Sequence, residues 1–241
     1  MEITHIVFLS LIGIGAGFLN RVSGFGMGIF AMLFLPHFIS SSVAAAAITS
    51  LFCAAISIYN GIRYRKNVQF KTVLPMVVAA IICIPIAVYF SKSVSGEIIR
   101  IILGAVLILL SLYFVFFSEK IKMEPTVTNG ILSGSLGGVL SGLFSVGGPP
   151  VVLYITSATK DKFTYFATIQ FYFCITDTYS VATRVANGII TKEIVICAAI
   201  TVLGCIIGAI LGKRVFDKLD SQKIKKTVYI LMLISGVLML F

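Results

Sequence analysis

The chain has 241 residues, of which 59% are apolar and 12% are charged, and its mean hydropathy is +1.07. This composition, with uncharged runs long enough to cross a bilayer, predicts a membrane protein and leaves no room for a soluble nucleotide-binding or solute-binding domain. The formal net charge of +10 does not indicate a nucleic-acid partner, because the cations lie in short loops between apolar segments, where the positive-inside rule explains them.

The first apolar segment, residues 3–39, is interrupted at residues 20–28 by the stretch NRVSGFGMG. One helix of that length would be ~55 Å long, whereas the hydrocarbon core is ~30 Å thick. We therefore expect a helical hairpin that enters and leaves on one side, with the break near mid-bilayer. The glycines permit a non-helical turn, and a helix restarting after them would offer free N–H groups to an anion.

A second interrupted segment lies at residues 125–159. Shifting the sequence by 121 positions places Gly13 on Gly134 and Gly26 on Gly147, so the stretch GLFSVGGPP at 142–150 falls where the first break falls. Its two prolines suit the first turn of a restarted helix. Paired interruptions of this kind, in corresponding halves, indicate the binding site of a secondary transporter.

Uninterrupted spans are predicted at about 42–60, 72–91, 101–118, 163–186, 194–212 and 226–241. With both interrupted segments as hairpins, 14 of the 19 Lys and Arg residues lie on one side of the membrane and 3 on the other. The richer side is expected to be cytoplasmic and both termini external.

Each half then has a hairpin plus three spans, which is an odd number of crossings. Residues 124–241 should therefore be inverted relative to residues 1–123. The predicted fold is an all-α polytopic membrane protein of two inverted repeats, which crosses the cell membrane several times. Glycines recurring every four residues are expected to pack helices closely; they are Gly130, Gly134, Gly138 and Gly142, and Gly204, Gly208 and Gly212.

Arg21 lies in the first break, where a cation is costly unless it faces protein, water or an anion. It is a candidate anion ligand, and the alternative is a structural pair with Asp177. Neutral polar side chains at the breaks suit an oxyanion, but they could equally satisfy backbone groups freed by the break. The predicted substrate-binding residues are Asn20, Arg21, Ser23, Gly24, Gly26, Gly28, Ser145, Gly147, Gly148 and Pro149.

Asp177 and Arg184 lie seven residues apart on one face of a predicted span and are candidates for ion coupling. Asp177 would act as a proton carrier. Arg184 could pair with it through water or other groups, or extend to the outer surface. Gln170, Thr176 and Thr178 are weaker polar candidates on the same span.

Catalytic and metal-binding patterns are missing from the sequence. The stretch GLFSVG does not match the G-x-S-x-G nucleophile elbow, and the two histidines are expected near the outer surface. The five cysteines lie in apolar runs without a CxxC pair, and no P-loop is present. We expect neither an enzyme, nor a cofactor, nor an ATP-driven pump.

The motifs SGFGMG and GLFSVGGPP, the four-plus-four duplication and the length resemble the sulfite exporter TauE/SafE family of membrane permeases over the whole chain. The resemblance implies transport of sulfite, sulfonates and related organic anions across the bacterial inner membrane. Met27 departs from the Gly or Ser expected in the first motif, and would narrow or desolvate the site. The expected partners are a small anionic substrate and the lipid bilayer, and a homo-oligomer is compatible with the sequence. The alternatives are a permease for another small solute, a proton-coupled transporter using Asp177, and a structural membrane subunit.

Overall fold

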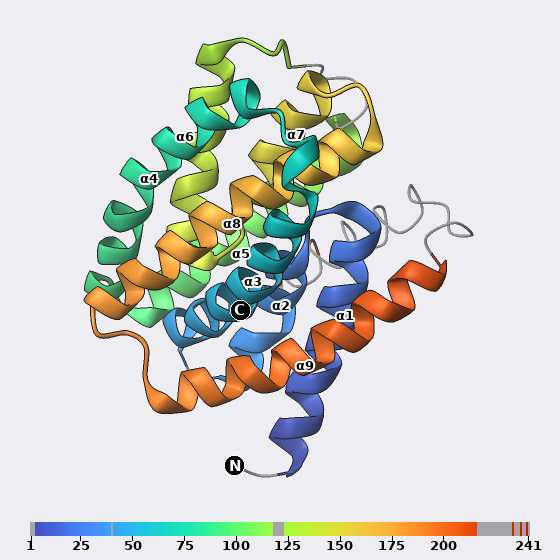
Figure 1. Ribbon diagram of the computed structural model, residues 1–241. Coiled ribbons are helices and arrows are strands. Elements are labelled where there is room, and N and C mark those ends of the chain that lie inside the picture. Colours follow the sequence, from blue (N-terminus) through green and yellow to red (C-terminus); the bar gives the residue numbers. More distant parts are fainter. Residues whose placement is uncertain are drawn as a thin grey trace.

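A computed structural model describes residues 3–39, 41–117 and 123–215, together with the isolated positions 233, 237 and 240, and in this part of the chain it contains helices and no strand (Figure 1). The helices are α1 (Ile3–Ser23), α2 (Met27–Phe38), α3 (Ser42–Tyr64), the 3-10 turn η1 (Arg65–Asn67), α4 (Phe70–Ser93), α5 (Gly96–Phe117), α6 (Val127–Phe144), α7 (Gly148–Ala158), α8 (Lys162–Ala186) and α9 (Lys192–Val215). The all-α prediction is confirmed.

Six helices among the described residues are long and apolar enough to cross a membrane: α1, α3 with η1, α4, α5, α6 and α9. Helix α8 has 25 residues but is less apolar, because it carries Gln170 and several threonines and tyrosines as well as Asp177 and Arg184. The chain is thus a multi-pass membrane protein, as predicted. The predicted span 226–241 lies outside the described residues, apart from three isolated positions.

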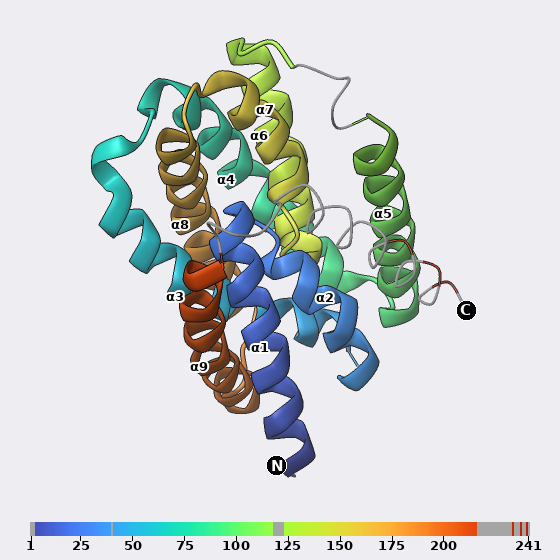
Figure 2. The same ribbon diagram turned by 90° about the vertical axis from the view of Figure 1, so that its right-hand side faces the viewer.

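Both interrupted segments turn back on themselves. The ring of Phe8, near the start of α1, lies 3.4 Å from the ring of Phe38 at the end of α2, measured between centroids. The hydroxyl of Tyr154 in α7 donates to the carbonyl of Thr126, the N-cap of α6, at 3.0 Å. Figure 2 shows α1 and α2 side by side. Each break therefore lies at the tip of a helical hairpin.

Contacts between helices fix their relative directions. Helix α3 is antiparallel to α8, since Ser57 contacts Asp177 whereas Asn60, further along α3, bonds to Gln170, earlier in α8. The backbone N–H of Gln69, before α4, donates to Thr168 near the start of α8 at 3.0 Å.

At the other end of α4, Lys92 Nζ donates to the carbonyl of Asn187 beyond α8 at 2.7 Å. Helices α4 and α8 are therefore parallel. We call the end that carries residues 63–71 and 160–162 the basic end, and the end that carries Lys92, Asn187 and Lys192 the opposite end.

Two helix pairs cross with almost no side chain between them. Along α6, a Cβ at Gly134 would clash with the backbone of Met76, and a Cβ at Gly138 would crowd Ala80, both in α4. Along α9, Gly204 and Gly208 meet the backbone of α1 in the same way. The glycines spaced by four residues thus pack helices, as their spacing predicts.

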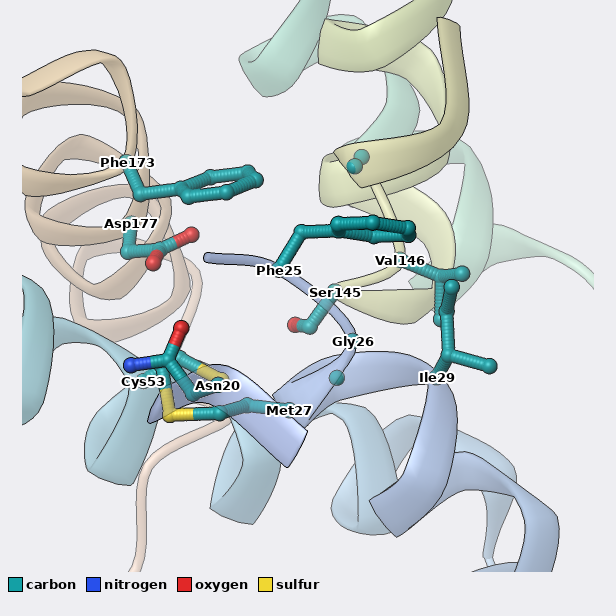
Figure 3. A pocket seen from close by; sticks show the side chains of 13 residues that line it. Asn20, Phe25, Gly26, Met27, Ile29, Cys53, Ser145, Val146, Phe173 and Asp177 are labelled. Atoms are coloured by element: carbon teal, nitrogen blue, oxygen red, sulfur yellow. The ribbon is translucent and has the colours of Figure 1, made fainter. Parts of the chain in front are cut away.

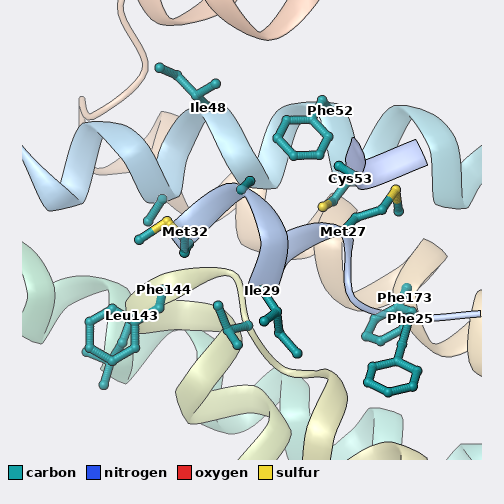
Figure 4. Packing of buried hydrophobic residues seen from close by; sticks show 14 of the residues in the cluster. Phe25, Met27, Ile29, Met32, Ile48, Phe52, Cys53, Leu143, Phe144 and Phe173 are labelled. Atoms are coloured by element: carbon teal, nitrogen blue, oxygen red, sulfur yellow. The ribbon is translucent and has the colours of Figure 1, made fainter. Parts of the chain in front are cut away.

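The hydrophobic core surrounds α2, the short arm of the first hairpin. Figure 4 shows Met27, Ile29 and Met32 of α2 between side chains of α3 and of the end of α6. Large apolar side chains are exposed along one face of α4, as expected for a lipid contact; they are Leu74, Val78, Ile82, Ile86 and Tyr89.

Candidate functional site

The two helix breaks meet in the middle of the structure. A Cβ added to Gly28, at the start of α2, would clash with the carbonyl oxygen of Ser145, at the end of α6. Ser145 has a φ of 57°, in the left-handed region, and its hydroxyl donates to the carbonyl of Ala46 in α3 at 2.9 Å. The first break turns at Gly24 and Gly26, with φ values of 78° and 100°. Glycine at position 28 thus lets the backbones of the two halves touch.

A small cavity of about 20 Å³ lies between the breaks (Figure 3). We call it the central cavity; its lining residues are Asn20, Phe25, Gly26, Met27, Gly28, Ile29, Cys53, Ser145, Val146, Gly147, Gly148, Phe173 and Asp177. Helices α2 and α7 both begin at this cavity, and neither has a side-chain N-cap. Pro149 and Pro150 stand in the first turn of α7. This volume holds about one water molecule, so the cavity is closed to a larger anion in this state.

Asp177 of α8 lines the central cavity. Its carboxylate is the only one among the residues that line this cavity. Its Oδ2 accepts a hydrogen bond from the Ser57 hydroxyl at 3.4 Å. Arg21 does not pair with it, since Arg21 Nη1 donates to the Tyr64 hydroxyl at 3.2 Å. The structural pairing of Arg21 with Asp177 is therefore not made.

Arg21 lines a second, larger pocket of about 480 Å³ toward the basic end. Three cations, Arg21, Arg63 and Lys213, line it, and the lining includes no carboxylate. We call it the basic pocket; its other lining residues are Asn20, Ala55, Ile56, Tyr59, Asn60, Tyr64, Phe166, Val202, Ile206, Ala209 and Ile210.

Arg21 lies toward the basic end and does not line the central cavity. Helix α1 has 21 residues and is about 31 Å long. Helix α2 has 12 residues and is about 18 Å long. Arg21 consequently lies beside Tyr64, the last residue of α3, and near Lys213 in the last turn of α9.

Three amide side chains lie between the basic pocket and the central cavity. Asn60 Nδ2 donates to Gln170 Oε1 at 3.1 Å. Gln170 Nε2 donates to Asn20 Oδ1 at 3.1 Å and to the carbonyl of Gly24 at 2.7 Å. Asn20 lines both spaces. We call these three residues the amide bridge, and they join α3, α8 and the first break.

The hydroxyl of Ser23 lies within hydrogen-bond distance of the carbonyls of Leu19 and Phe25, so it satisfies backbone at the break. Thr176 and Thr178 bond to carbonyls of their own helix. Arg184 is fully buried, and its Nη2 donates to the carbonyl of Gly142 at 2.8 Å. Of the alternatives for Arg184, extension to the outer surface does not occur, because its side chain is buried against the last turn of α6.

Sequence reasoning missed Ser57 and Asn60 of α3, which contact Asp177 and Gln170. Their spacing of three residues places both on one face of α3, which also carries Thr49 and Ser50 in its first half. That polar pair was the signal in the sequence. Phe25 and Phe173, which close the cavity in Figure 3, have no such signal, because aromatic residues occur throughout the chain.

The family model for the sulfite exporter TauE/SafE family matches residues 9–239. The chain belongs to this family. Members of the TauE/SafE family are membrane exporters, so the chain is a transporter and not an enzyme.

A curated relative in Cupriavidus necator bears the name "Probable sulfite/organosulfonate exporter TauE". It is 27% identical to this chain over 218 residues, which cover 85% of this chain and 81% of the relative. No solved structure gives a significant match to this TauE/SafE chain.

Proposed function

We propose that this chain exports small sulfur oxyanions of the sulfite and organosulfonate class through a path between the two helix breaks. The observation that carries the proposal is the meeting of both breaks at one cavity, where α2 and α7 begin without side-chain caps. Two helix N-termini that face one space favour an anion. The name of the relative in Cupriavidus necator supports the substrate class.

The basic pocket is the proposed entry site. Three cations without a lining carboxylate raise the local concentration of an anion. Because 14 of the 19 Lys and Arg residues fall on this side in the predicted topology, we assign the basic end to the cytoplasm. The anion would bind near Arg21 first, and reach the central cavity when the amide bridge opens.

The directions of the helices support an inverted repeat of residues 1–123 and 124–241. Helix α3 is antiparallel to α8, its counterpart in the second half. The hairpin helix α1 packs on α9 of the second half, and α6 packs on α4 of the first half, which is the exchange an inverted repeat produces. In this proposal the two halves rock against each other around the breaks. The central cavity then opens first to one side of the membrane and afterwards to the other.

Export of a monovalent anion needs no coupled ion. An inside-negative potential contributes about 2.3 kcal/mol per 100 mV to its exit, or roughly a fortyfold concentration ratio. We therefore propose a uniporter driven by the membrane potential and the solute gradient.

The position of Asp177 supports a second candidate function, that of a proton-coupled exporter. Its side chain lines the central cavity, and two negative charges a few ångströms apart repel strongly in a poorly hydrated space. A proton carried by Asp177 would remove that repulsion while the anion passes. The two candidate mechanisms differ in the net charge that crosses the membrane with each anion. The flux of the Asp177→Asn variant therefore distinguishes them.

Radiolabelled sulfite flux in proteoliposomes tests the substrate class. We expect counterflow of [35S]sulfite that unlabelled sulfite and alkanesulfonates inhibit, and that phosphate, nickel and neutral amino acids leave unchanged. Equal inhibition by phosphate would show a general anion permease, and no protein-dependent sulfite flux would exclude the proposal.

A further inference from the structure

Arg184 has more hydrogen-bond donors than the described part of the chain satisfies. Its side chain is fully buried, and its Nη2 lies 2.8 Å from the carbonyl of Gly142, 3.2 Å from that of Ser141 and 3.4 Å from the Ser145 hydroxyl. Its Nε and Nη1 meet no hydrogen-bond partner in the part of the chain that the structure describes. Three of the five guanidinium N–H groups therefore have no acceptor among the described residues.

Helix packing explains the contacts of Arg184 Nη2 but not the unpaired Nε and Nη1 groups. The carbonyls of Ser141 and Gly142 belong to the last turn of α6, where a cation complements the helix dipole and caps free carbonyls. That role uses Nη2. Among the described residues it leaves three buried donors without acceptors, and native structures normally avoid the free-energy cost of such donors unless an ion or water binds there.

A second unpaired group lies one turn before Arg184 on the same helix. The Ser180 hydroxyl is buried and has no partner among the described residues. Asp177, three residues earlier, lines the central cavity. Positions spaced by three, four and seven residues share one face of a helix. A buried polar stripe thus leads along α8 from the central cavity past Ser180 to Arg184.

This stripe runs away from the basic pocket. Helix α8 begins at the basic end and ends beside Lys92 at the opposite end, through the bond to Asn187. Arg184 is in its last turn. Arg21 lies with Tyr64 and Lys213 on the other side of the central cavity. The two arginines near the breaks therefore lie on opposite sides of the central cavity.

We propose that Arg184 and Ser180 form a second oxyanion site, which the substrate occupies after it has passed the breaks and before it leaves at the opposite end. This site rests on the proposed sulfur-oxyanion transport and extends it. The guanidinium and the hydroxyl supply donors to the sulfonate or sulfite oxygens, and Nη2 keeps the end of α6 in place. The anion would then bind Arg21 on the side of the basic pocket and Arg184 on the side of the opposite end, one after the other.

Ser180→Ala is the sharpest test, because it removes a hydroxyl that bonds to no described residue, so the variant should fold normally. Uptake of [35S]sulfite is measured in membrane vesicles of both orientations. We expect the half-saturating sulfite concentration to rise about tenfold in the orientation that exposes the opposite end, and to stay within about twofold in the other. Ser93→Ala, an exposed serine at the opposite end whose hydroxyl bonds to its own helix, is the matched control.

Arg184→Gln and Arg184→Lys complete the experiment. The glutamine variant should lose saturable sulfite uptake from the opposite end, and the lysine variant should recover part of it. If wild-type vesicles transport sulfite but Ser180→Ala keeps wild-type half-saturation in both orientations, the second site is excluded while the proposed function stands. If wild-type vesicles show no sulfite flux, it is the proposed function that fails.

Discussion

The side-chain amide of Gln170 donates to Oδ1 of Asn20 at 3.1 Å and so ties α8 to the first helix break. Asn60 of α3 donates to the same Gln170 side chain from the other direction. The bridge is fully buried at Gln170 and separates the basic pocket from the central cavity. In the proposed path it would act as a gate between the basic pocket and the central cavity.

Replacing Gln170 with alanine should destabilise the closed state, because Asn20 and Asn60 lose their shared partner. We expect a loss of about 2 kcal/mol and a melting temperature about 4–8 °C lower. Thermal unfolding of the purified protein in detergent measures this. Gln69→Ala, which changes an exposed glutamine, should stay within about 0.5 kcal/mol of wild type. Equal melting temperatures for the two variants would show that the amide bridge contributes nothing to the closed state.

Gly28→Ala should destabilise the protein, because the added Cβ would meet the carbonyl oxygen of Ser145. The two breaks would have to separate, at a cost of about 1–3 kcal/mol or more. The matched control is Gly96→Ala, since a Cβ at Gly96 meets no atom within 4 Å. Melting temperatures and sulfite flux should both fall for Gly28→Ala and hold for Gly96→Ala. A wild-type melting temperature in Gly28→Ala would contradict the close contact of the two breaks.

The sequence allowed the hairpins to be predicted, because residues 3–39 and 125–159 are too long for one span and their glycines and prolines mark the turns. It did not allow the position of Arg21 to be predicted. That position depends on how unequally the hairpin divides between α1 and α2, and apolar residues continue on both sides of the break.

The partners of the buried polar groups could not be predicted either. Gln170 and Asn60 are 110 positions apart, and Ser57 and Asp177 are 120 apart. Only the folded packing of α3 on α8 brings them together. Arg184 was assigned to the span correctly, but its contact with the end of α6 depends on how α6 lies against α8 in three dimensions.

Asp161 caps α8 outside the membrane and makes stability depend on pH. Its carboxylate accepts hydrogen bonds from the backbone N–H groups of Thr164, at 2.9 Å, and Phe163, at 3.0 Å, and the bond from Thr164 is the main cause that lowers the pKa of this carboxyl. The stabilisation is therefore complete above the ordinary carboxyl pKa of about 4 and is lost as the pH falls through the lowered folded-state pKa.

Asp161→Ala should accordingly lower the melting temperature at neutral pH, and the difference from wild type should shrink below about pH 4. Melting curves of both proteins across this range measure the effect. A difference that is constant from neutral to acidic pH would show that the charged carboxylate is not the cap.

Asp177→Asn separates the uniporter from the proton-coupled exporter. In the uniporter, a potassium diffusion potential that is negative inside should speed [35S]sulfite efflux from proteoliposomes, and Asp177→Asn should leave this response intact. The Ser57 hydroxyl can donate to an amide oxygen as well as to a carboxylate, so the variant should fold. Flux that ignores the potential and collapses in Asp177→Asn would instead establish proton coupling.

The central claim is that an anion reaches the breaks through the basic pocket, where Arg21 binds it. The most direct measurement compares the initial rate of [35S]sulfite efflux for wild type, Arg21→Gln and Arg21→Lys with that of Arg65→Gln, which removes an exposed charge outside the pocket. We expect Arg21→Gln to lose at least about 90% of the flux with normal expression, and Arg21→Lys to lie between it and wild type, since lysine keeps the charge but not the planar fork. Arg65→Gln should match wild type, and full flux in Arg21→Gln would contradict the account.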